Sequence, residues 1–269
     1  MPRTPRRTAA IAVVVVVLLV IVGVVAYLAG RAGQNVAPST PPTASATAPS
    51  GPTSPRYTPT TDEGSPQAGL ARGVVSAGQG GTTAGPSNLP LGYPQDENGA
   101  VAAATNYLIW MNSIKITDKE QADAMADTAA ADASTRSALV QSFDELRTGM
   151  ESLKADQPEP ARGAYAIANY AAGRATIYIW APEVTTDTDN VTDHLWGVDS
   201  VRLVWASGDW KLDGALIAQT GGAAVDPTNP AGNPTAAEKA SILSRTPADP
   251  GEITDTASQT WTEYANAPG

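Results

Sequence analysis

The chain of 269 residues contains no cysteine, one histidine and one phenylalanine. The absence of cysteine excludes disulfides, thiolate catalysis and cysteine-ligated metal sites. Because His194 is the single histidine, the sequence also disfavours a histidine-rich metal site and a catalytic triad. An exported domain without disulfides fits a bacterial surface, and a composition rich in Ala, Gly, Pro and Thr resembles proteins of high-GC bacteria such as actinobacteria.

Basic residues are also scarce, with 17 Lys and Arg against 27 Asp and Glu and a formal net charge of −10. The four charged residues before Gln34 are all arginines, so the remainder of the chain carries a formal charge of −14. An acidic domain repels phosphate backbones, and no clustered basic footprint is present. We therefore expect no nucleic-acid partner.

One long hydrophobic run is present near the N-terminus, and it predicts a transmembrane helix over residues 9–30 after a cytoplasmic tail of residues 1–8. The run has the roughly 20 uncharged residues that a helix needs to cross a membrane. Three arginines precede it and only Arg31 closely follows it, so the positive-inside bias puts the N-terminus in the cytoplasm and the rest outside. The expected anchor residues include Ala9, Val15, Leu19, Val22 and Leu28.

A cleavable signal peptide is the alternative for this segment. Gly30 and Ala32 form a small-x-small pattern that fits a cleavage site, although the apolar run is longer than the roughly 7–15 residues typical of signal peptides.

Residues 31–88 are rich in Pro, Ser, Thr, Ala and Gly and lack a periodic apolar pattern. Such a segment buries too little surface to offset its ordering entropy, so the sequence predicts a disordered linker. A flexible coil of this length spans about 40 Å, which suits a tether that lifts a domain away from the membrane.

The sequence predicts that residues 89–218 form the extracytoplasmic domain, which begins with three helices. The first begins near Glu97, and the second follows a capping box of Thr117 and Glu120 and runs to about Ala131. The third carries the most regular amphipathic stripe in the chain. That stripe consists of Leu139, Phe143, Leu146, Met150 and Leu153.

The sequence period then changes to that of β-strands. One hairpin joins residues 164–170 to 174–184 through a turn at Gly173, and a second joins residues 194–205 to 210–212. Helices followed by two hairpins predict an α+β domain with helices packed on one face of an antiparallel sheet.

Residues 219–269 form a Pro-rich tail with a short helix predicted after the capping box of Thr235 and Glu238. Trp261 and Tyr264 lie near its end. These aromatics either dock back onto the domain or serve as interaction residues for a partner.

Two stretches resemble membrane-anchored actinobacterial proteins of the nuclear transport factor 2-like fold, also seen in ketosteroid isomerase. Residues 99–107, Gly-Ala-Val-Ala-Ala-Ala-Thr-Asn-Tyr, look like the opening helix, and residues 201–205 with 208–212 look like the paired strands. The resemblance implies a curved four-stranded sheet that curls around a helix into a cone. The plan of anchor, tether and cone is also similar to the assembly-factor subunit of type IV secretion and conjugation machines, and to mammalian-cell-entry-associated membrane proteins.

The sequence carries no constellation that predicts catalysis, cofactor binding or a metal site. Asp187, Asp189, Asp193 and Asp199 lack the spacing of a calcium-binding loop and indicate a solvated acidic loop. The tryptophans are expected to fill the core in place of phenylalanine. They are Trp110, Trp180, Trp196, Trp205 and Trp210.

We therefore expect a non-enzymatic, single-pass protein of the cell envelope whose domain is a protein-interaction module in a membrane assembly, with other envelope proteins as partners. A ligand-binding or enzymatic cone is the alternative, and a deep pocket holding a carboxylate with a raised pKa would support it.

Overall fold

The computed structural model describes residues 69–171, 173–214, 220–221, 231–244 and 260–268. The expected membrane helix and its residues Ala9, Val15, Leu19, Val22 and Leu28 lie outside these ranges. No helix in the described part of the chain combines the length and apolarity needed to cross a membrane.

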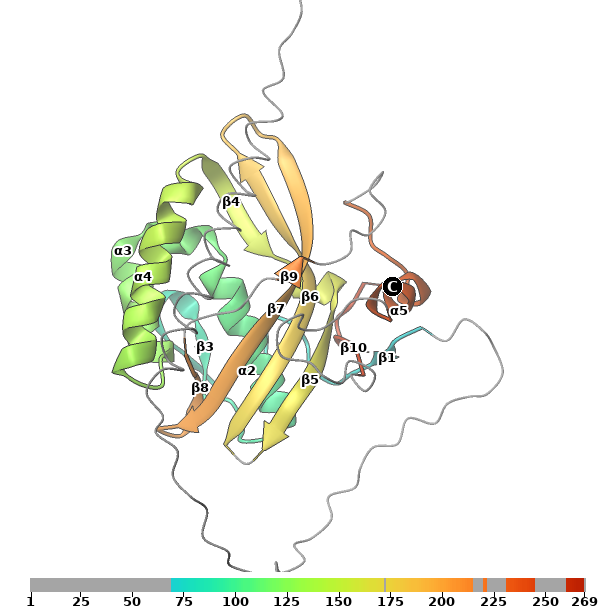
Figure 1. Cartoon of the computed structure of the whole chain (residues 1–269), viewed down its shortest axis with the longest axis horizontal. Helices are drawn as coiled ribbons and strands as arrows, with labels where there is room; N and C mark the ends of the chain where they lie inside the picture. The colour runs from blue at the N-terminus through green and yellow to red at the C-terminus, as the bar shows by residue number, and fades with distance from the viewer. Residues whose placement is uncertain (1–68, 172, 215–219, 222–230, 245–259, 269) are drawn as a thin grey trace, which may run out of the picture.

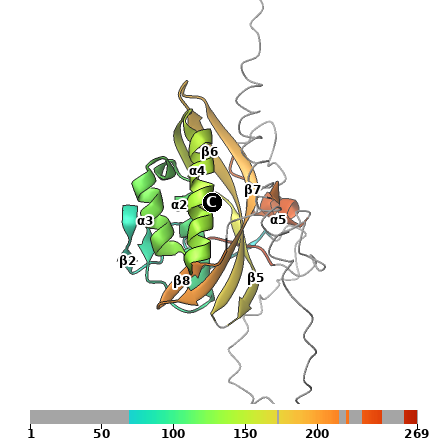
Figure 2. The same ribbon diagram turned by 60° about the vertical axis from the view of Figure 1, so that its left-hand side comes forward.

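The described residues form an α+β domain, as the sequence predicts. Figure 1 shows helices packed beside one mixed sheet, and Figure 2 shows three of these helices on one face of the sheet with the short C-terminal helix α5 (Ala236–Leu243) on the other. The three are α2 (Glu97–Met111), α3 (Lys119–Ala129) and α4 (Ala133–Met150).

The sheet is built around two long antiparallel strands, β6 (Arg174–Asp187) and β7 (Thr192–Ala206). On the far edge of β6, β5 (Ala164–Ala171) and β4 (Leu153–Pro158) pair with successive halves of the strand, and β8 (Asp209–Leu212) pairs with β7. Two-residue strands complete it. They are β1 (Ala71–Arg72), which pairs in parallel with β10 (Thr262–Glu263) beside β5, and β9 (Thr220–Gly221), which pairs with β7.

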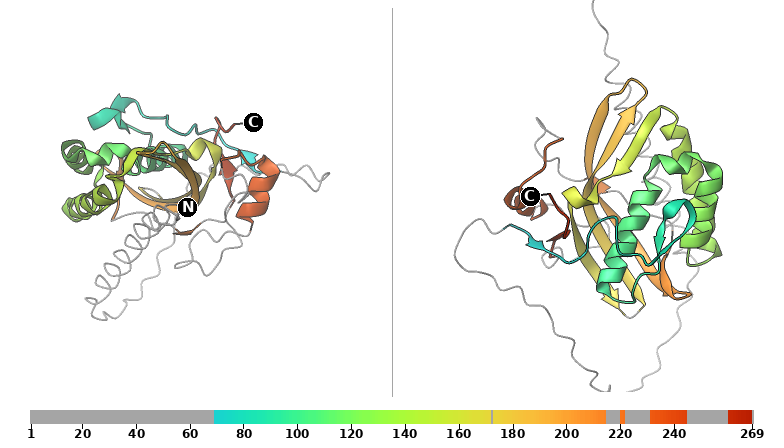
Figure 3. Two further views of the ribbon diagram at one scale, coloured as in Figure 1. Left: turned by 90° about the horizontal axis from the view of Figure 1, so that it is seen from above. Right: turned by 180° about the vertical axis from the view of Figure 1, so that it is seen from behind.

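This sheet differs from the expected four-stranded cone. It contains more strands, includes a parallel pair, and is neither closed nor strongly curled (Figure 3). The additional strands are β1, β4, β9 and β10. Except for β4, each has two residues, too few to show a local β-pattern without its pairing partner.

Residues 69–88 also correct the expected linker boundary. They contain β1, the short strand β2 (Thr83–Ala84), which pairs with β3 (Pro90–Leu91), and a 3-10 turn at Pro86–Asn88. Val75 is buried in the helix-side core, so part of the stretch assigned to the tether belongs to the domain.

The two faces of β6 are covered by different parts of the chain. Ala175, Ile177 and Ile179 face the helices in the main core, while Tyr178 and Trp180 face α5 in a second core. Trp180 packs against Trp196 with ring centroids 4.4 Å apart. Both rings lie in the second core, whereas Trp110 and Trp210 lie in the main core, in keeping with the large apolar area that each ring buries.

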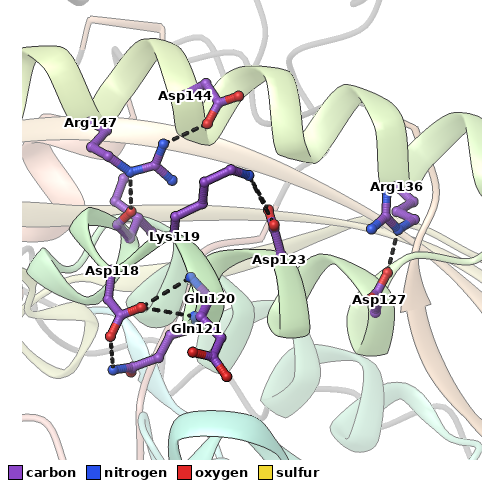
Figure 4. Close-up of polar contacts among 10 residues, drawn as sticks. Asp118, Lys119, Glu120, Gln121, Asp123, Asp127, Arg136, Asp144 and Arg147 are labelled. Carbon is purple, nitrogen blue, oxygen red and sulfur yellow. Dashed lines mark hydrogen bonds and ion pairs between the residues drawn. The ribbon is translucent and has the colours of Figure 1, made fainter.

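Helix starts follow the capping rules that the sequence displays. Asp96, Asp118 and Asp132 cap α2, α3 and α4 through backbone N–H groups of the first turn. The N-cap of α3 is Asp118 rather than the expected Thr117, and Figure 4 shows its carboxylate accepting from the amides of Glu120 and Gln121.

Ion pairs lie on the solvent-facing surfaces of α3 and α4. Lys119 pairs with Asp123, Arg136 with Asp127, and Arg147 with Asp144 (Figure 4). Their side chains are partly or largely exposed, so each pair contributes little to folding stability.

A buried carboxylate at the β7–β8 turn fixes the chain that leads into α2. The turn residues Ser207 and Gly208 have φ values of 54° and 80°, the left-handed region that a two-residue hairpin requires. Asp209 then accepts hydrogen bonds from the amides of Gly92 (2.9 Å), Tyr93 (3.1 Å) and Trp210 (2.9 Å).

Replacing Asp209 is expected to destabilise the domain strongly. The change Asp209→Ala leaves these buried donors without their acceptor, and we expect a loss of about 3 kcal/mol in the free energy of unfolding. Urea unfolding followed by tryptophan fluorescence measures it. The matched control Asp213→Ala removes a carboxylate that pairs with the exposed Arg174, and should cost less than about 1 kcal/mol. Equal losses for the two variants would contradict the assignment.

Candidate functional site

A buried carboxyl pair lies where β4 meets β6. Asp156 is only 4% exposed, and its Oδ1 atom has no hydrogen-bond partner in the described structure. The strand register places Asp156 opposite Thr185 and Pro158 opposite Glu183, so Asp156 and Glu183 are diagonal neighbours on one face of the sheet. Because side chains alternate along β6, this is the face that carries Ile177, on the helix side.

Burial raises the pKa of Asp156 from 3.8 to about 9, with a smaller contribution from the charge of Glu183 and a hydrogen bond with its side chain. Asp156 is therefore protonated at neutral pH. A neutral carboxyl group can donate a hydrogen bond as well as accept one, which distinguishes it from the exposed carboxylates of this acidic chain.

The same face of the sheet has open space beside Glu183. Ala181 and Gly197 are register partners, and a Cβ atom placed on Gly197 would meet no atom of the described chain within 4 Å. The next helix-side positions along β7 are Asp199, which is 7% exposed, and Leu195, which is 41% exposed. Small residues therefore separate a carboxyl group on β7 from the pair on β4 and β6.

This region is not arranged as a metal site. Over the residues that the structure describes, no three His, Cys, Asp or Glu side chains form a group that could hold a metal ion.

His194 lies near this region but takes part in a structural network. Its Nδ1 atom is 3.1 Å from Nη1 of Arg162, which also donates to Glu159. Arg162 further binds the side chain of Asn233 and lies over the ring of Trp196. The network fastens the segment before α5 to the sheet.

A second feature is the distal hairpin, residues 183–195, where β6 and β7 extend beyond β5 (Figure 1). Its turn is ordered by Asp187, whose Oδ1 accepts from the amides of Asp189 (2.8 Å) and Val191 (2.9 Å). Asp187 therefore stabilises the turn, while Asp189 and Asp193 are exposed to solvent, as expected of a solvated acidic loop.

The distal hairpin also presents apolar side chains to solvent. The exposed large hydrophobic residues of the described chain are Val74, Val191 and Leu195, so two of these three lie on the hairpin. Lys154 on β4 holds the turn through Asn190 at 2.8 Å. The distal hairpin is therefore an ordered projection that carries two exposed apolar side chains.

The two aromatics proposed as interaction residues are buried against the domain. Trp261 is 7% exposed in the core beneath α5, and Tyr264 is fully buried with its hydroxyl 2.9 Å from Thr105 Oγ1. In this conformation Trp261 and Tyr264 are therefore docked onto the domain. Contact of either residue with a partner stays a prediction.

Sequence reasoning missed the carboxyl pair because it placed Leu153 in the third helix. The structure ends α4 at Met150 and starts β4 at Leu153, and the pairing of β4 with the distal half of β6 creates the Asp156–Glu183 contact. The alternation of Ala155 and Gln157, both exposed, around buried Asp156 was the available signal, although a buried Asp contradicts the usual polar-out pattern.

A family model described as a domain of unknown function (DUF8175) matches residues 28–233, and the chain therefore belongs to this family. No curated protein matches the chain. No solved structure matches it either.

The stability of the domain should depend on pH through Asp156. Unfolding returns its pKa from about 9 to 3.8, so between these values the folded state binds more protons, and stability falls as the pH rises. The variant Asp156→Asn lacks this titration, so its free energy of unfolding should fall less steeply with pH. The slope should differ from that of the original chain by at most about 1.4 kcal/mol per pH unit. Urea unfolding at mildly acidic and mildly alkaline pH measures it.

The exposed hairpin variant Asp193→Asn serves as the control for this measurement and should keep the slope of the original chain. An unchanged slope in Asp156→Asn would show that the Asp156 carboxyl ionises alike in the folded and unfolded chains.

Proposed function

We propose that this member of the DUF8175 family is a non-enzymatic, single-pass envelope protein whose extracytoplasmic domain is a protein-interaction module in a membrane assembly, and that the distal hairpin makes the contact. The observation that carries the proposal is the exposure of Val191 and Leu195 on an ordered projection of the sheet. Exposed apolar residues that lie together on a surface mark protein interaction sites.

The burial of both faces of β6 supports an interaction through the surface of the domain rather than through its interior. The centre of β6 is buried on both faces by side chains of the same chain, so its aromatic residues are not available to a partner in this conformation. The projecting ends of β6 and β7 remain available to a partner at the distal hairpin, where Val191 and Leu195 are exposed.

The membrane part of the proposal depends on the sequence. The apolar run of residues 9–30 and its flanking arginines support an N-in anchor, and the following Pro-rich segment, now shortened to residues 31–68, supports a tether. A tether of this kind lets the distal hairpin reach a partner in the envelope.

A nuclear transport factor 2-like plan in open form remains part of the proposal. The chain order of three helices, β4 and the antiparallel run from β5 to β8 is in keeping with that plan. A role in conjugation or type IV secretion follows from the resemblance of the anchor-plus-domain plan, and the mammalian-cell-entry-associated proteins are an alternative assembly.

Ligand binding is a second candidate function, favoured by the buried neutral carboxyl group of Asp156 near the open space at Gly197. A ligand with a hydrogen-bond acceptor and a small apolar part would suit these side chains. Binding should then be lost in Asp156→Ala while the hairpin contact remains.

Photocrosslinking in cells tests the interaction module. A photoreactive amino acid replaces Val191 or Leu195 in the full-length chain, and captured proteins are identified by mass spectrometry. We expect the same envelope protein to be captured from both positions because their side chains share one projection. The control position is Ser137, which is exposed on α4. Capture from Ser137 alone, or equal capture from all three positions, would contradict a contact through the distal hairpin.

A further inference from the structure

The C-terminal residues form a strap across the outer face of the sheet, and the family match ends before this strap begins. We define the C-terminal strap as α5 with its N-cap and C-cap, residues 235–244, together with residues 260–268. The match covers residues 28–233. Within the strap, α5 lies on the face of the sheet opposite α2 and α4 (Figures 2 and 3) and covers Trp261. Tyr264 instead reaches the main core, where its hydroxyl lies 2.9 Å from Thr105 Oγ1 on α2.

The strap holds the segment through which the chain enters the domain. The amide of Gly73 donates to the carbonyl of Glu263, and the amide of Ala265 donates to the carbonyl of Val75, both at 2.8 Å. Asn266 bonds the amide and the carbonyl of Ala77 at 2.9 and 3.1 Å. The first described residues and the last are thus joined to each other.

The centre of the strap is a buried ion pair. Lys239 Nζ on α5 lies 2.7 Å from Glu263 Oε1 on β10, and the side chains are 1% and 5% exposed. A buried ion pair fixes the register of two segments but adds little net stability, because both charges regain hydration when the segments separate. The contact therefore favours one docked geometry while keeping detachment accessible.

Backbone pairing between the strap and the rest of the sheet is short. β1 and β10 have two residues each, and β10 meets β5 at the single register pair Thr262 and Tyr165. By contrast, β6 and β7 pair continuously from Arg174 opposite Val204 to Thr186 opposite Thr192. Short ladders open at a lower free energy than the centre of a sheet.

We propose that the C-terminal strap detaches from β1, β5 and the outer face of the sheet while β5, β6 and β7 stay folded. Detachment would uncover the outer edge of β5 and the apolar residues Trp180 and Trp196, and would free the attachment point of the tether. The strap is then a conformational device that closes the outer face and fixes where the chain leaves the domain.

Hydrogen exchange of the full-length protein in detergent micelles, followed by mass spectrometry, tests this inference. We expect the amides of Gly73 and Ala265 to exchange at least about tenfold faster than the paired amides of β6 and β7. Exchange of all these amides at one common rate would overturn the inference, because it would mean that only global unfolding releases the strap.

Two variants extend the test. Lys239→Met removes the nearer partner of buried Glu263 and leaves only Arg72, whose Nη2 is 4.0 Å from Glu263 Oε2. The variant should accelerate exchange in the strap and β1 by about a hundredfold or more, with little change in β6 and β7. Equal acceleration in β6 and β7, or global unfolding of the variant, would show that the strap is an integral part of the fold. Lys154→Met, at an exposed lysine, is the matched control and should leave strap exchange unchanged.

Because the chain has no cysteine, two introduced cysteines can form a single defined disulfide between the strap and β1. Ala71 and Thr262 are register partners, and neighbouring strands lie about 4.8 Å apart, within the range that a disulfide spans. In the oxidised double variant Ala71→Cys/Thr262→Cys, strap exchange should slow at least about tenfold compared with the reduced form. If the disulfide forms and exchange does not slow, the fast exchange does not come from separation of β1 and β10, and the inference fails.

Discussion

The architecture depends on the need to cover both faces of β6. This strand presents large apolar residues in both directions, Ile177 and Ile179 to one side and Tyr178 and Trp180 to the other. A strand of this composition is unstable in a two-layer domain unless a third layer covers its second face. Helices α2 and α4 provide one cover, and the C-terminal strap provides the other. The segments most distant in sequence are therefore held together by the demands of one central strand.

Local patterns in the sequence predicted most of the elements around this strand. Each of α2, α3 and α4 has an acidic N-cap and a spaced set of apolar residues, and the two hairpins have a glycine at the turn. The capping box of Thr235 and Glu238 marked α5 to within a residue. These features follow from hydrogen bonding and backbone geometry within a few residues, which is why a single sequence reveals them.

The elements that were missed depend on contacts between distant residues. β1 and β10 have two residues each and exist because residues 71–72 meet residues 262–263. β4 follows α4 after two residues, so its first apolar residue, Leu153, continues the helical spacing of Leu146 and Met150. The carboxyl pair of Asp156 and Glu183 could be recognised only once β4 was placed against β6, since nothing local distinguishes a buried Asp from a solvated one.

The joined ends of the domain also affect how the protein can be engineered. Gly73 and Glu263 are hydrogen-bonded neighbours at one edge of the sheet, away from the distal hairpin (Figure 1). A fluorescent protein fused to the C-terminus would therefore be attached close to the tether and leave the opposite end of the domain unobstructed. Proximity of the two ends also favours circular permutation, in which a short linker joins them and new termini are opened in an exposed loop. The feature that fixes the tether thus makes the domain a practical scaffold for reporters.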